Sequence, residues 1–208
     1  MLHRGKERPE VKLPPPRERG ETSLEETVAR RRSVRDYKEK PLSLSQLSQV
    51  LWAAQGLTDA RGLRATPSAG ATYPLEVYIL IGRDCVDGIE PGIYYYDVVK
   101  HSLNLHKEGD QRGELAIAAR DQEFIARAPV DIVICAIFER TSWYYGRRAE
   151  RYVHMEAGHA GENVSLQAVA LGLATVMVGA FDDEQVSAVM GLAKEVKPLY
   201  IIPLGKPR

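Results

Sequence analysis

Four arginines and a serine lie within six consecutive positions of the sequence, from Arg30 to Arg35. The planar guanidinium group carries five donors in a rigid fork that matches the oxygens of a phosphate, and the hydroxyl of Ser33 adds a neutral donor. Such a cluster suits a small phosphate-bearing ligand. Two other interpretations are open. The arginines could complement the dipole of a helix C-terminus, or they could belong to a nucleic-acid surface, which normally needs a broader basic field.

An amphipathic helix is predicted directly before the arginines. Thr22 or Ser23 suits the N-cap, and Glu25 or Glu26 three residues later would complete a capping box. Apolar and polar residues then alternate at helical spacing up to residue 31. The helix therefore carries the arginine cluster at its C-terminal end, where an extended turn follows.

Two downstream stretches contain the small residues that let a backbone approach a ligand closely. Residues 67–74 read Pro-Ser-Ala-Gly-Ala-Thr-Tyr-Pro, and residues 172–181 read Gly-Leu-Ala-Thr-Val-Met-Val-Gly-Ala-Phe. Taken alone, the first stretch also fits an ordinary loop between a helix and a strand. The order of the two stretches and the arginine cluster carries more information than any one of them.

In this order and rough spacing, the three stretches resemble the FMN-dependent nitroreductase superfamily. The full pattern is most similar to its SagB-type branch, the dehydrogenases associated with thiazole and oxazole formation in peptides. The resemblance extends from about residue 12 to residue 208. It implies an α+β fold in which helices flank a mixed or antiparallel central sheet with a long central helix. It also implies an intertwined homodimer that binds FMN at the subunit interface.

The resemblance assigns a role to each matching position. Arg31 and Ser33, with Arg32 beside them, match contacts to the phosphate and ribityl chain, and Arg35 matches a cation that faces N1 and O2 of the flavin. The other matching positions form a loop from the partner subunit, backbone amides near N5 and a C-terminal pair of phosphate-binding cations: Pro67, Ser68, Ala69 and Gly70; Val178, Gly179 and Ala180; Lys206 and Arg208. The implied cofactor is FMN, and the implied electron donor is NADH or NADPH.

The reaction implied by the resemblance is hydride transfer through flavin N5. Members that oxidise peptide azolines often carry a Lys-Tyr pair. Here Tyr145 matches the tyrosine and is the catalytic candidate, whereas Tyr144 stands at the position of the lysine. Tyrosine is a poor base near neutral pH. We therefore expect a reductase of nitro compounds, quinones or similar small acceptors, with azoline oxidation and non-catalytic binding of a flavin or phosphate ligand as alternatives.

Length and composition set limits on these interpretations. A chain of 208 residues suits one domain, which we place at residues 21–208. Residues 1–20 are rich in charge and proline and are expected to be a flexible or wrapping arm. The formal net charge of zero argues against a nucleic-acid partner. The longest nearly apolar run, at 168–181, is too short to span a bilayer, so we expect a cytoplasmic protein.

No metal site is predicted. Cys85 and Cys135 provide no disulfide framework, and Cys135 lies within an apolar run that predicts a buried strand. His154, Glu156 and His159 form one candidate group for a metal. Residues five apart on a helix are turned by about 140° around its axis, so the two histidines do not share a face. We predict a buried hydrogen-bonded network there.

Periodicity predicts the elements that must position these residues. One predicted helix is capped by Ser43 or Ser45, runs through Gln55 and ends at a C′ glycine, Gly56. Further predicted helices span 110–120, 123–127 and 148–173, with a short helix from 182. Predicted strands span 76–82, 130–138, 174–180 and 199–204, with a hairpin at 92–97 and 102–106. Successive side chains of a strand face opposite sides, so the tyrosines at 94–96 cannot form one stacking platform. An aromatic, basic loop is predicted at 139–148, where it could contact substrate.

Overall fold

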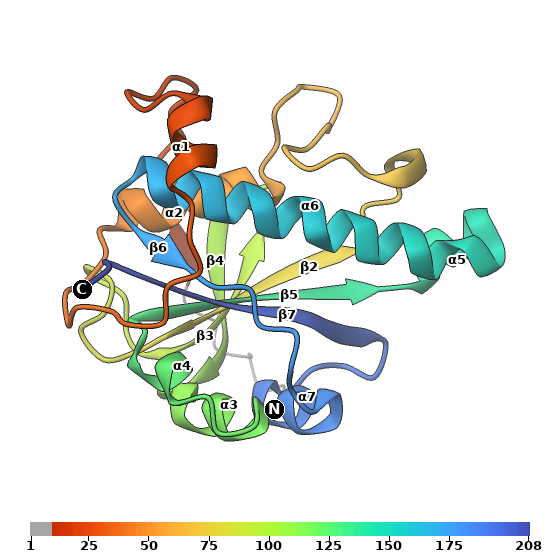
Figure 1. Cartoon of the computed structure of the whole chain (residues 1–208). Coiled ribbons are helices and arrows are strands. Elements are labelled where there is room, and N and C mark those ends of the chain that lie inside the picture. The colour runs from red at the N-terminus through yellow and green to blue at the C-terminus, as the bar shows by residue number, and fades with distance from the viewer. Residues whose placement is uncertain (1–9) are drawn as a thin grey trace, which may run out of the picture.

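Seven strands form one sheet across residues 10–208, the part of the chain that the computed structural model describes (Figure 1). The strand order is β1-β4-β3-β2-β5-β7-β6, and each neighbouring pair is antiparallel. In chain order the strands are β1 (Glu10–Lys12), β2 (Leu75–Ile81), β3 (Gly92–Asp97), β4 (Ser102–Glu108), β5 (Val130–Ile137), β6 (Ala174–Thr175) and β7 (Val196–Gly205). The predicted α+β class with a mixed or antiparallel sheet is confirmed.

Helices cover both faces of this sheet. Figure 1 shows α2 and α6 on one face and α3, α4 and α7 on the other. The helices are α1 (Leu24–Arg30), α2 (Leu44–Gln55), α3 (Arg112–Ala118), α4 (Glu123–Arg127), α5 (Glu139–Tyr145), α6 (Ala149–Ala170) and α7 (Asp183–Met190), with short 3₁₀ turns η1 (Ala69–Ala71) and η2 (Gly146–Arg148). The long central helix is therefore confirmed, and its 22 residues span about 33 Å.

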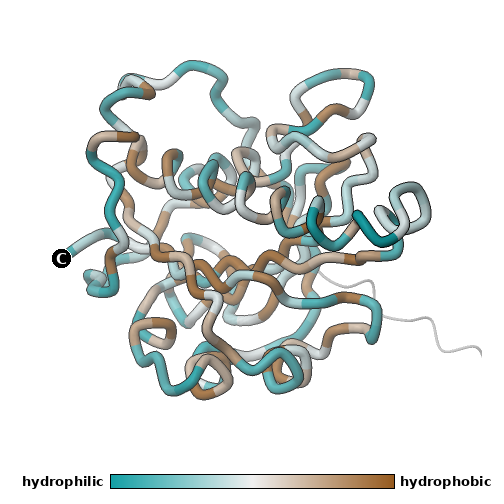
Figure 2. Tube along the Cα trace, turned by 45° about the vertical axis from the view of Figure 1, so that its right-hand side comes forward, coloured by the Kyte–Doolittle hydropathy of each residue, from teal (hydrophilic) through white to brown (hydrophobic). Residues whose placement is uncertain are grey.

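The core has two halves because both faces of the sheet are covered. Side chains alternate along a strand, so Val77 and Ile79 of β2 pack under α2 and α6, whereas Tyr78 and Leu80 pack with α3 and α7. Cys135 lies in the second half and is fully buried, as the sequence predicts. Figure 2 shows hydrophobic residues concentrated along the central strands and hydrophilic residues on the protruding loops.

Local sequence signals explain where the first two helices begin. The Ser23 hydroxyl accepts from the Glu26 amide at 3.2 Å, and the Glu26 carboxylate accepts from the Ser23 amide at 3.1 Å. Ser43 forms the same reciprocal box at the start of α2, so both predicted helix starts are confirmed. Gly56 ends α2 as predicted, but its backbone is extended (φ −62°) and not left-handed. A Cβ there would lie 2.2 Å from Trp52, so close packing requires the glycine.

The end of α6 directs the chain toward the sheet edge. The Leu173 amide donates to the Ala168 carbonyl at 2.8 Å and the Gly172 amide to the Val169 carbonyl at 3.0 Å, a Schellman motif with Gly172 at φ +68°. The predicted strand at 174–180 is wrong beyond its first two residues. Only Ala174 and Thr175 belong to β6, and Val178 forms an isolated bridge with Ile201 of β7.

The N-terminal segment packs against its own chain over the residues that the structure describes. Strand β1 pairs with β4, and the backbone amide of Arg17 donates to the Gln49 side chain at 2.8 Å. Residues 1–9 of the predicted arm lie outside the described residues. Within residues 10–208, no helix has both the length and the apolar character required to cross a membrane.

Candidate functional site

The arginine cluster and the C-terminus lie side by side. We call the surface formed by residues 31–35, 175–180 and 206–208 the donor edge. Ser33 forms a parallel bridge with Thr175, and the Val34 amide donates to the Thr175 carbonyl at 3.0 Å. Further along, the Lys38 amide donates to the Lys206 carbonyl at 2.9 Å. Backbone hydrogen bonds therefore bring together three segments that are far apart in the sequence.

The buried side chain of Tyr37 holds these segments together. The Tyr37 hydroxyl donates to the Val34 carbonyl at 2.6 Å, and a Cβ built on Gly205 would lie 2.9 Å from the Tyr37 ring. Burial, together with the nearby carboxyl of Asp131, raises the pKa of Tyr37 above its ordinary value. Tyr37 is therefore a neutral hydrogen-bond donor at neutral pH, and it holds the segment that follows the arginines against β7.

The predicted arginines differ in what they contact. The Arg31 guanidinium lies 3.8 Å from Glu162 of α6, with both side chains more than one-third exposed. Arg32 donates to the carbonyls of Ala29 and Arg31 at 3.0 and 2.6 Å, so it complements the C-terminus of α1. The Arg35 guanidinium lies 5.7 Å from the centre of the Phe124 ring.

The remaining predicted residues of the donor edge mostly present hydrogen-bond donors. Gly179 and Ala180 are exposed, and their amides have no acceptor among the described residues. The Lys206 ammonium group likewise has no partner within that part of the chain, whereas Arg208 lies 3.7 Å from Asp36. Together with Ser33, these groups form a surface that favours an anionic ligand with several acceptor atoms.

The predicted stretch at residues 67–74 forms a strained loop. We call residues 67–73 together with helix α5 the loop clasp. Gly70, Ala71 and Tyr73 all have positive φ, at +59°, +53° and +45°. A left-handed backbone at a non-glycine residue is uncommon and concentrates where ligands are clamped. The Ser68 hydroxyl supports this turn by accepting from the Tyr73 amide at 2.9 Å.

The aromatic, basic loop predicted at 139–148 is wrong. These residues form α5 and the short turn η2, and α5 packs directly on the strained loop. The Thr141 and Thr72 hydroxyls lie 2.9 Å apart, and Arg140 donates to the Tyr73 carbonyl at 3.1 Å while forming an ion pair with the buried Glu76. A charged residue within the apolar strand β2 was the sequence signal for such a partner.

The catalytic candidate Tyr145 belongs to the loop clasp. A Cβ built on Gly70 would lie 2.8 Å from the Tyr145 hydroxyl oxygen, so the tyrosine contacts the loop closely. Its ring centre lies 5.0 Å from that of Tyr152 and 4.8 Å from that of Tyr144, both in edge-on orientations. Tyr144 itself is 67% exposed. The structure therefore places Tyr145 against the predicted loop and leaves Tyr144 at the surface.

The two regions lie toward opposite ends of α6 (Figure 1). Thr175 of the donor edge is 3.2 Å from Ser165, near the C-terminal end of the helix. The rings of Tyr145 of the loop clasp and of Tyr152, near the N-terminal end, meet edge to face. Tyr152 and Ser165 are 13 positions apart, which corresponds to about 20 Å of helix. The described residues show no hydrogen bond or ion pair that joins Pro67, Ser68, Ala69 or Gly70 to Arg31 or Ser33.

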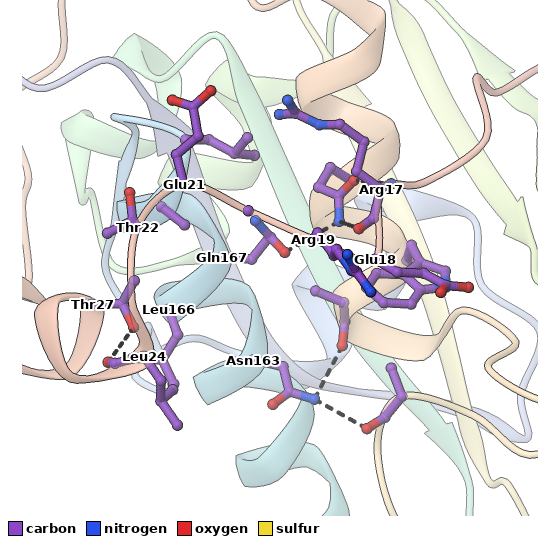
Figure 3. A pocket seen from close by; sticks show the side chains of 17 residues that line it. Arg17, Glu18, Arg19, Glu21, Thr22, Leu24, Thr27, Asn163, Leu166 and Gln167 are labelled. Atoms are coloured by element: carbon purple, nitrogen blue, oxygen red, sulfur yellow. Dashed lines mark hydrogen bonds between the residues drawn. The ribbon is translucent and has the colours of Figure 1, made fainter.

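A pocket of about 550 Å³ lies between the N-terminal segment, α2 and α6 (Figure 3). Its wall includes Arg17, Arg19, Glu21, Asn163 and Gln167, and none of the predicted cofactor residues is among the described residues that line it. Asn163 donates to the backbone carbonyl of Ala53 at 3.1 Å. The wall of the pocket thus carries charges of both signs, in contrast to the donor edge.

The predicted network at His154, Glu156 and His159 is wrong. Both histidines are exposed, whereas Glu156 is 2% exposed and its Oε1 has no hydrogen-bond partner among the described residues. Burial raises the pKa of Glu156 to about 7, and the hydroxyl of Ser68 and the charge of Arg64 oppose the rise. Within residues 10–208, no cluster of three or more His, Cys, Asp or Glu side chains could hold a metal ion.

Known proteins resemble the chain in both sequence and fold. The "Putative nitroreductase MJ1384" of Methanocaldococcus jannaschii is 48% identical over 89% of this chain and 92% of its own length. A crystal structure of a "putative nitroreductase" from Ralstonia eutropha JMP134 has a TM-score of 0.84 and 29% identity, covering 98% of this chain and 92% of its own.

A further relative is named for the processing of microcin B17. The "Microcin B17-processing protein McbC" of Escherichia coli is 27% identical over 77% of this chain, which spans only 61% of the length of McbC.

Residues 28–206 match the Nitroreductase family and include most of the donor edge and the whole loop clasp. The fold implied by the resemblance is thus confirmed, and the protein belongs to the Nitroreductase family.

Proposed function

We propose that the protein is an FMN-dependent oxidoreductase that takes electrons from NADH or NADPH and reduces nitro compounds, quinones or similar small acceptors. The observation that carries this proposal is the donor edge, where Ser33, Lys206 and the neighbouring arginines converge from both ends of the chain. Membership of the Nitroreductase family supports an oxidoreductase. A bound FMN would supply the redox chemistry by accepting and returning a hydride at N5.

The donor set at the edge fits the chemistry of FMN. Arg31, Ser33 and Lys206 would hold the phosphate, because charge-assisted hydrogen bonds from guanidinium and ammonium groups are the strongest that a protein offers to phosphate oxygens. The exposed amides of Gly179 and Ala180 would donate to acceptor atoms on the ring edge. Arg35 would face the side of the ring where negative charge develops on reduction, which favours hydride acceptance.

A second copy of the chain would complete the site. Tyr145 of the loop clasp and Thr175 of the donor edge contact α6 at points about 20 Å apart along the helix. As in the family that the sequence resembles, Pro67–Gly70 and Tyr145 of one chain would contact a cofactor held by the other. Two exposed apolar side chains of α1, Leu24 at 65% and Val28 at 58%, are consistent with a covered surface in a homodimer. The resulting site would place strained backbone on one side of the ring and donors on the other.

The first test is the visible absorption spectrum of the purified protein. A flavoprotein is yellow, and its colour should bleach when NADPH or NADH is added without oxygen and return when a quinone is added. A colourless protein that also fails to take up added FMN would overturn the proposal. Retention of FMN without bleaching by either nucleotide would favour the non-catalytic flavin-binding alternative.

Oxidation of peptide azolines is a second candidate function, favoured by the similarity to McbC. That chemistry needs a base that removes a proton as the hydride leaves. The position of the expected lysine is occupied by Tyr144, whose side chain is exposed, whereas Tyr145 contacts the loop. Incubation of the flavin-loaded protein with an azoline-containing peptide, followed by mass spectrometry for the loss of two hydrogens, separates this activity from small-molecule reduction.

A further inference from the structure

A buried carboxyl group lies behind the loop that we propose to contact the cofactor. Glu156 projects from the middle of α6, is 2% exposed and has one oxygen with no hydrogen-bond partner among the described residues. Leaving a buried carboxylate oxygen unpaired is costly. The protonation state of such a carboxyl is sensitive to small changes in solvation, because few hydrogen bonds stabilise either its ionised or its neutral form.

The cation that faces Glu156 is engaged elsewhere. Arg64 donates to the side-chain oxygen of Gln55 at 2.9 Å, and its guanidinium lies 4.4 Å from the centre of the Tyr73 ring. It is also attracted to Glu76 of β2. On α6 itself, Tyr152 is half-buried and His159 is exposed. Arg64 therefore stabilises the ionised carboxyl only in part, without forming an ion pair with it.

Ser68 connects this carboxyl to the surface of the loop clasp. Its hydroxyl lies close enough to Glu156 to affect the pKa of the carboxyl, and it also accepts from the Tyr73 amide at 2.9 Å. Ser68 is itself half-buried. A ligand that covers this loop would therefore remove water from the side on which Ser68 connects Glu156 to the surface.

We propose that Glu156 is a positioning residue that takes up a proton when FMN binds with its ring against the loop clasp. The proposal rests on the function proposed above. The FMN phosphate would lie at the donor edge, whereas the flavin ring would exclude water from the loop clasp. The ring would therefore desolvate the carboxyl further, which disfavours its ionised form. The neutral carboxyl can then donate a hydrogen bond to Ser68, which would stiffen the strained turn beneath the cofactor.

The size of the effect follows from the pKa of the free protein, which burial raises to about 7. If binding raises it by one further unit, uptake at pH 7.5 is about half a proton per site. In that case affinity is constant while both states are protonated and falls by about tenfold as pH rises from below 7 to above 8. The cofactor phosphate contributes little in this range because its second pKa is near 6.

The experiment is calorimetric titration of FMN into the apo protein at pH 7.5 in two buffers with different ionisation enthalpies. The observed binding enthalpies in the two buffers should differ by about half of the difference between the ionisation enthalpies of the buffers, which corresponds to the uptake of about half a proton. Glu156→Gln should abolish this difference and make the affinity independent of pH between 7 and 8.5. Glu150→Gln, which changes an exposed carboxyl in the first turn of the same helix, should retain the wild-type uptake.

A second variant keeps the test decisive if Glu156→Gln does not fold. Arg64→Met removes the cation that opposes protonation, so the fall in affinity should move to higher pH. FMN binding without proton uptake, or with the same uptake in Glu156→Gln, would overturn the role of Glu156 and leave the proposed function standing. No binding of FMN by the wild-type protein would overturn both.

Discussion

The donor edge and the loop clasp are built by opposite means. At the donor edge, backbone hydrogen bonds join distant segments, and side chains such as Lys206 and Ser33 have no hydrogen-bond or ion-pair partner among residues 10–208. In the loop clasp the backbone is strained, and hydroxyl and guanidinium groups are used to hold it in place. Donors that are to bind a ligand must not be used in internal hydrogen bonds. In the loop clasp, by contrast, the donors form internal hydrogen bonds that hold the strained backbone in its conformation.

This difference separates what each region contributes to the free energy of the protein. The donor edge should contribute little to folding, because its ion pairs are exposed and such pairs are worth about 0–1 kcal/mol. Its contribution should appear when a ligand binds. The loop clasp pairs through Arg140 with the buried carboxylate of Glu76 in β2, so it should affect folding directly. Substitutions can therefore move ligand affinity and the free energy of unfolding independently.

The largest expected effect is the loss of FMN affinity in Arg31→Ala. One charge-assisted hydrogen bond to phosphate is worth about 1.5–3 kcal/mol, so the dissociation constant should rise about 10–100-fold. The free energy of unfolding of the apo protein should hardly change, because the pair with Glu162 is exposed. Quenching of FMN fluorescence on binding measures the first quantity, and urea unfolding measures the second.

The matched control is Arg30→Ala, which removes an exposed guanidinium one residue earlier, at the end of α1. It should bind FMN with nearly wild-type affinity. An Arg31→Ala protein that retains full flavin occupancy after extensive dialysis would contradict the assignment of the donor edge as the phosphate site.

The converse result is expected for Arg140→Ala in the loop clasp. Glu76 is 7% exposed, and removal of its partner leaves a buried carboxylate uncompensated. Breaking a fully buried pair costs about 3–5 kcal/mol. Because Arg140 is 40% exposed, we expect a loss of about 2–3 kcal/mol in the free energy of unfolding. Arg147→Ala, an exposed arginine in η2, should unfold like the wild type; equal losses in the two variants would contradict a specific role for the ion pair.

The sequence predicts the donor edge better than the loop clasp for a physical reason. Capping boxes, apolar periodicity and the glycine after α6 are local signals, so the start of α1 and the turn into β6 could be placed from neighbouring residues alone. Helix α5 was missed because its seven residues include Trp143 and two tyrosines, which favour strands, and because it is too short for a clear period.

Long-range contacts were beyond sequence reasoning. Glu156 was assigned to a network with the histidines beside it on the helix. Its polar neighbours, Arg64 and Ser68, instead come from a loop that precedes it by about ninety residues. The ion pair between Glu76 and Arg140 is likewise distant in sequence. The predicted strand at 174–180 pairs with β7 as a ladder only at Ala174 and Thr175. At its far end Gly179 and Ala180 are exposed, and their amides have no acceptor among the described residues.

A gain in stability is expected at Asp131, which lies beneath Tyr37 under the donor edge. This carboxyl is fully buried, neither oxygen has a partner among the described residues, and burial raises its pKa well above the ordinary value. An unpaired buried polar group costs about 1–3 kcal/mol. Asp131→Val should therefore raise the free energy of unfolding by about 1–2 kcal/mol at pH 7, measured by urea unfolding.

The pH dependence identifies the cause of this gain. The folded carboxyl binds its proton more tightly than the unfolded one, whose pKa is about 3.9, so folding takes up a proton. This contribution to stability is fully present below pH 4 and is lost as pH rises toward the folded pKa. Asp131→Asn keeps an unpaired polar group but cannot titrate. Its stability relative to the wild type should therefore increase with pH, and a constant difference between pH 4 and 8 would contradict the assignment.

The smallest expected effects come from the two capping boxes, and they distinguish the edge of the molecule from its core. Loss of an N-cap hydroxyl costs about 1 kcal/mol. Helix α2 packs in the core, so Ser43→Ala should lower the global free energy of unfolding by that amount. Helix α1 buries only Thr27, so we expect it to open without the core, and Ser23→Ala should then leave global stability unchanged.

In Ser23→Ala the loss should appear as about fivefold faster hydrogen exchange of the α1 amides. Both variants remove the same hydroxyl from the same motif, so each is the control for the other. If Ser23→Ala lowers the melting temperature as much as Ser43→Ala, then α1 unfolds together with the core. The arginines of the donor edge would then be ordered as part of the fold, because α1 leads directly into them. Ligand binding would therefore cause little further ordering of this segment.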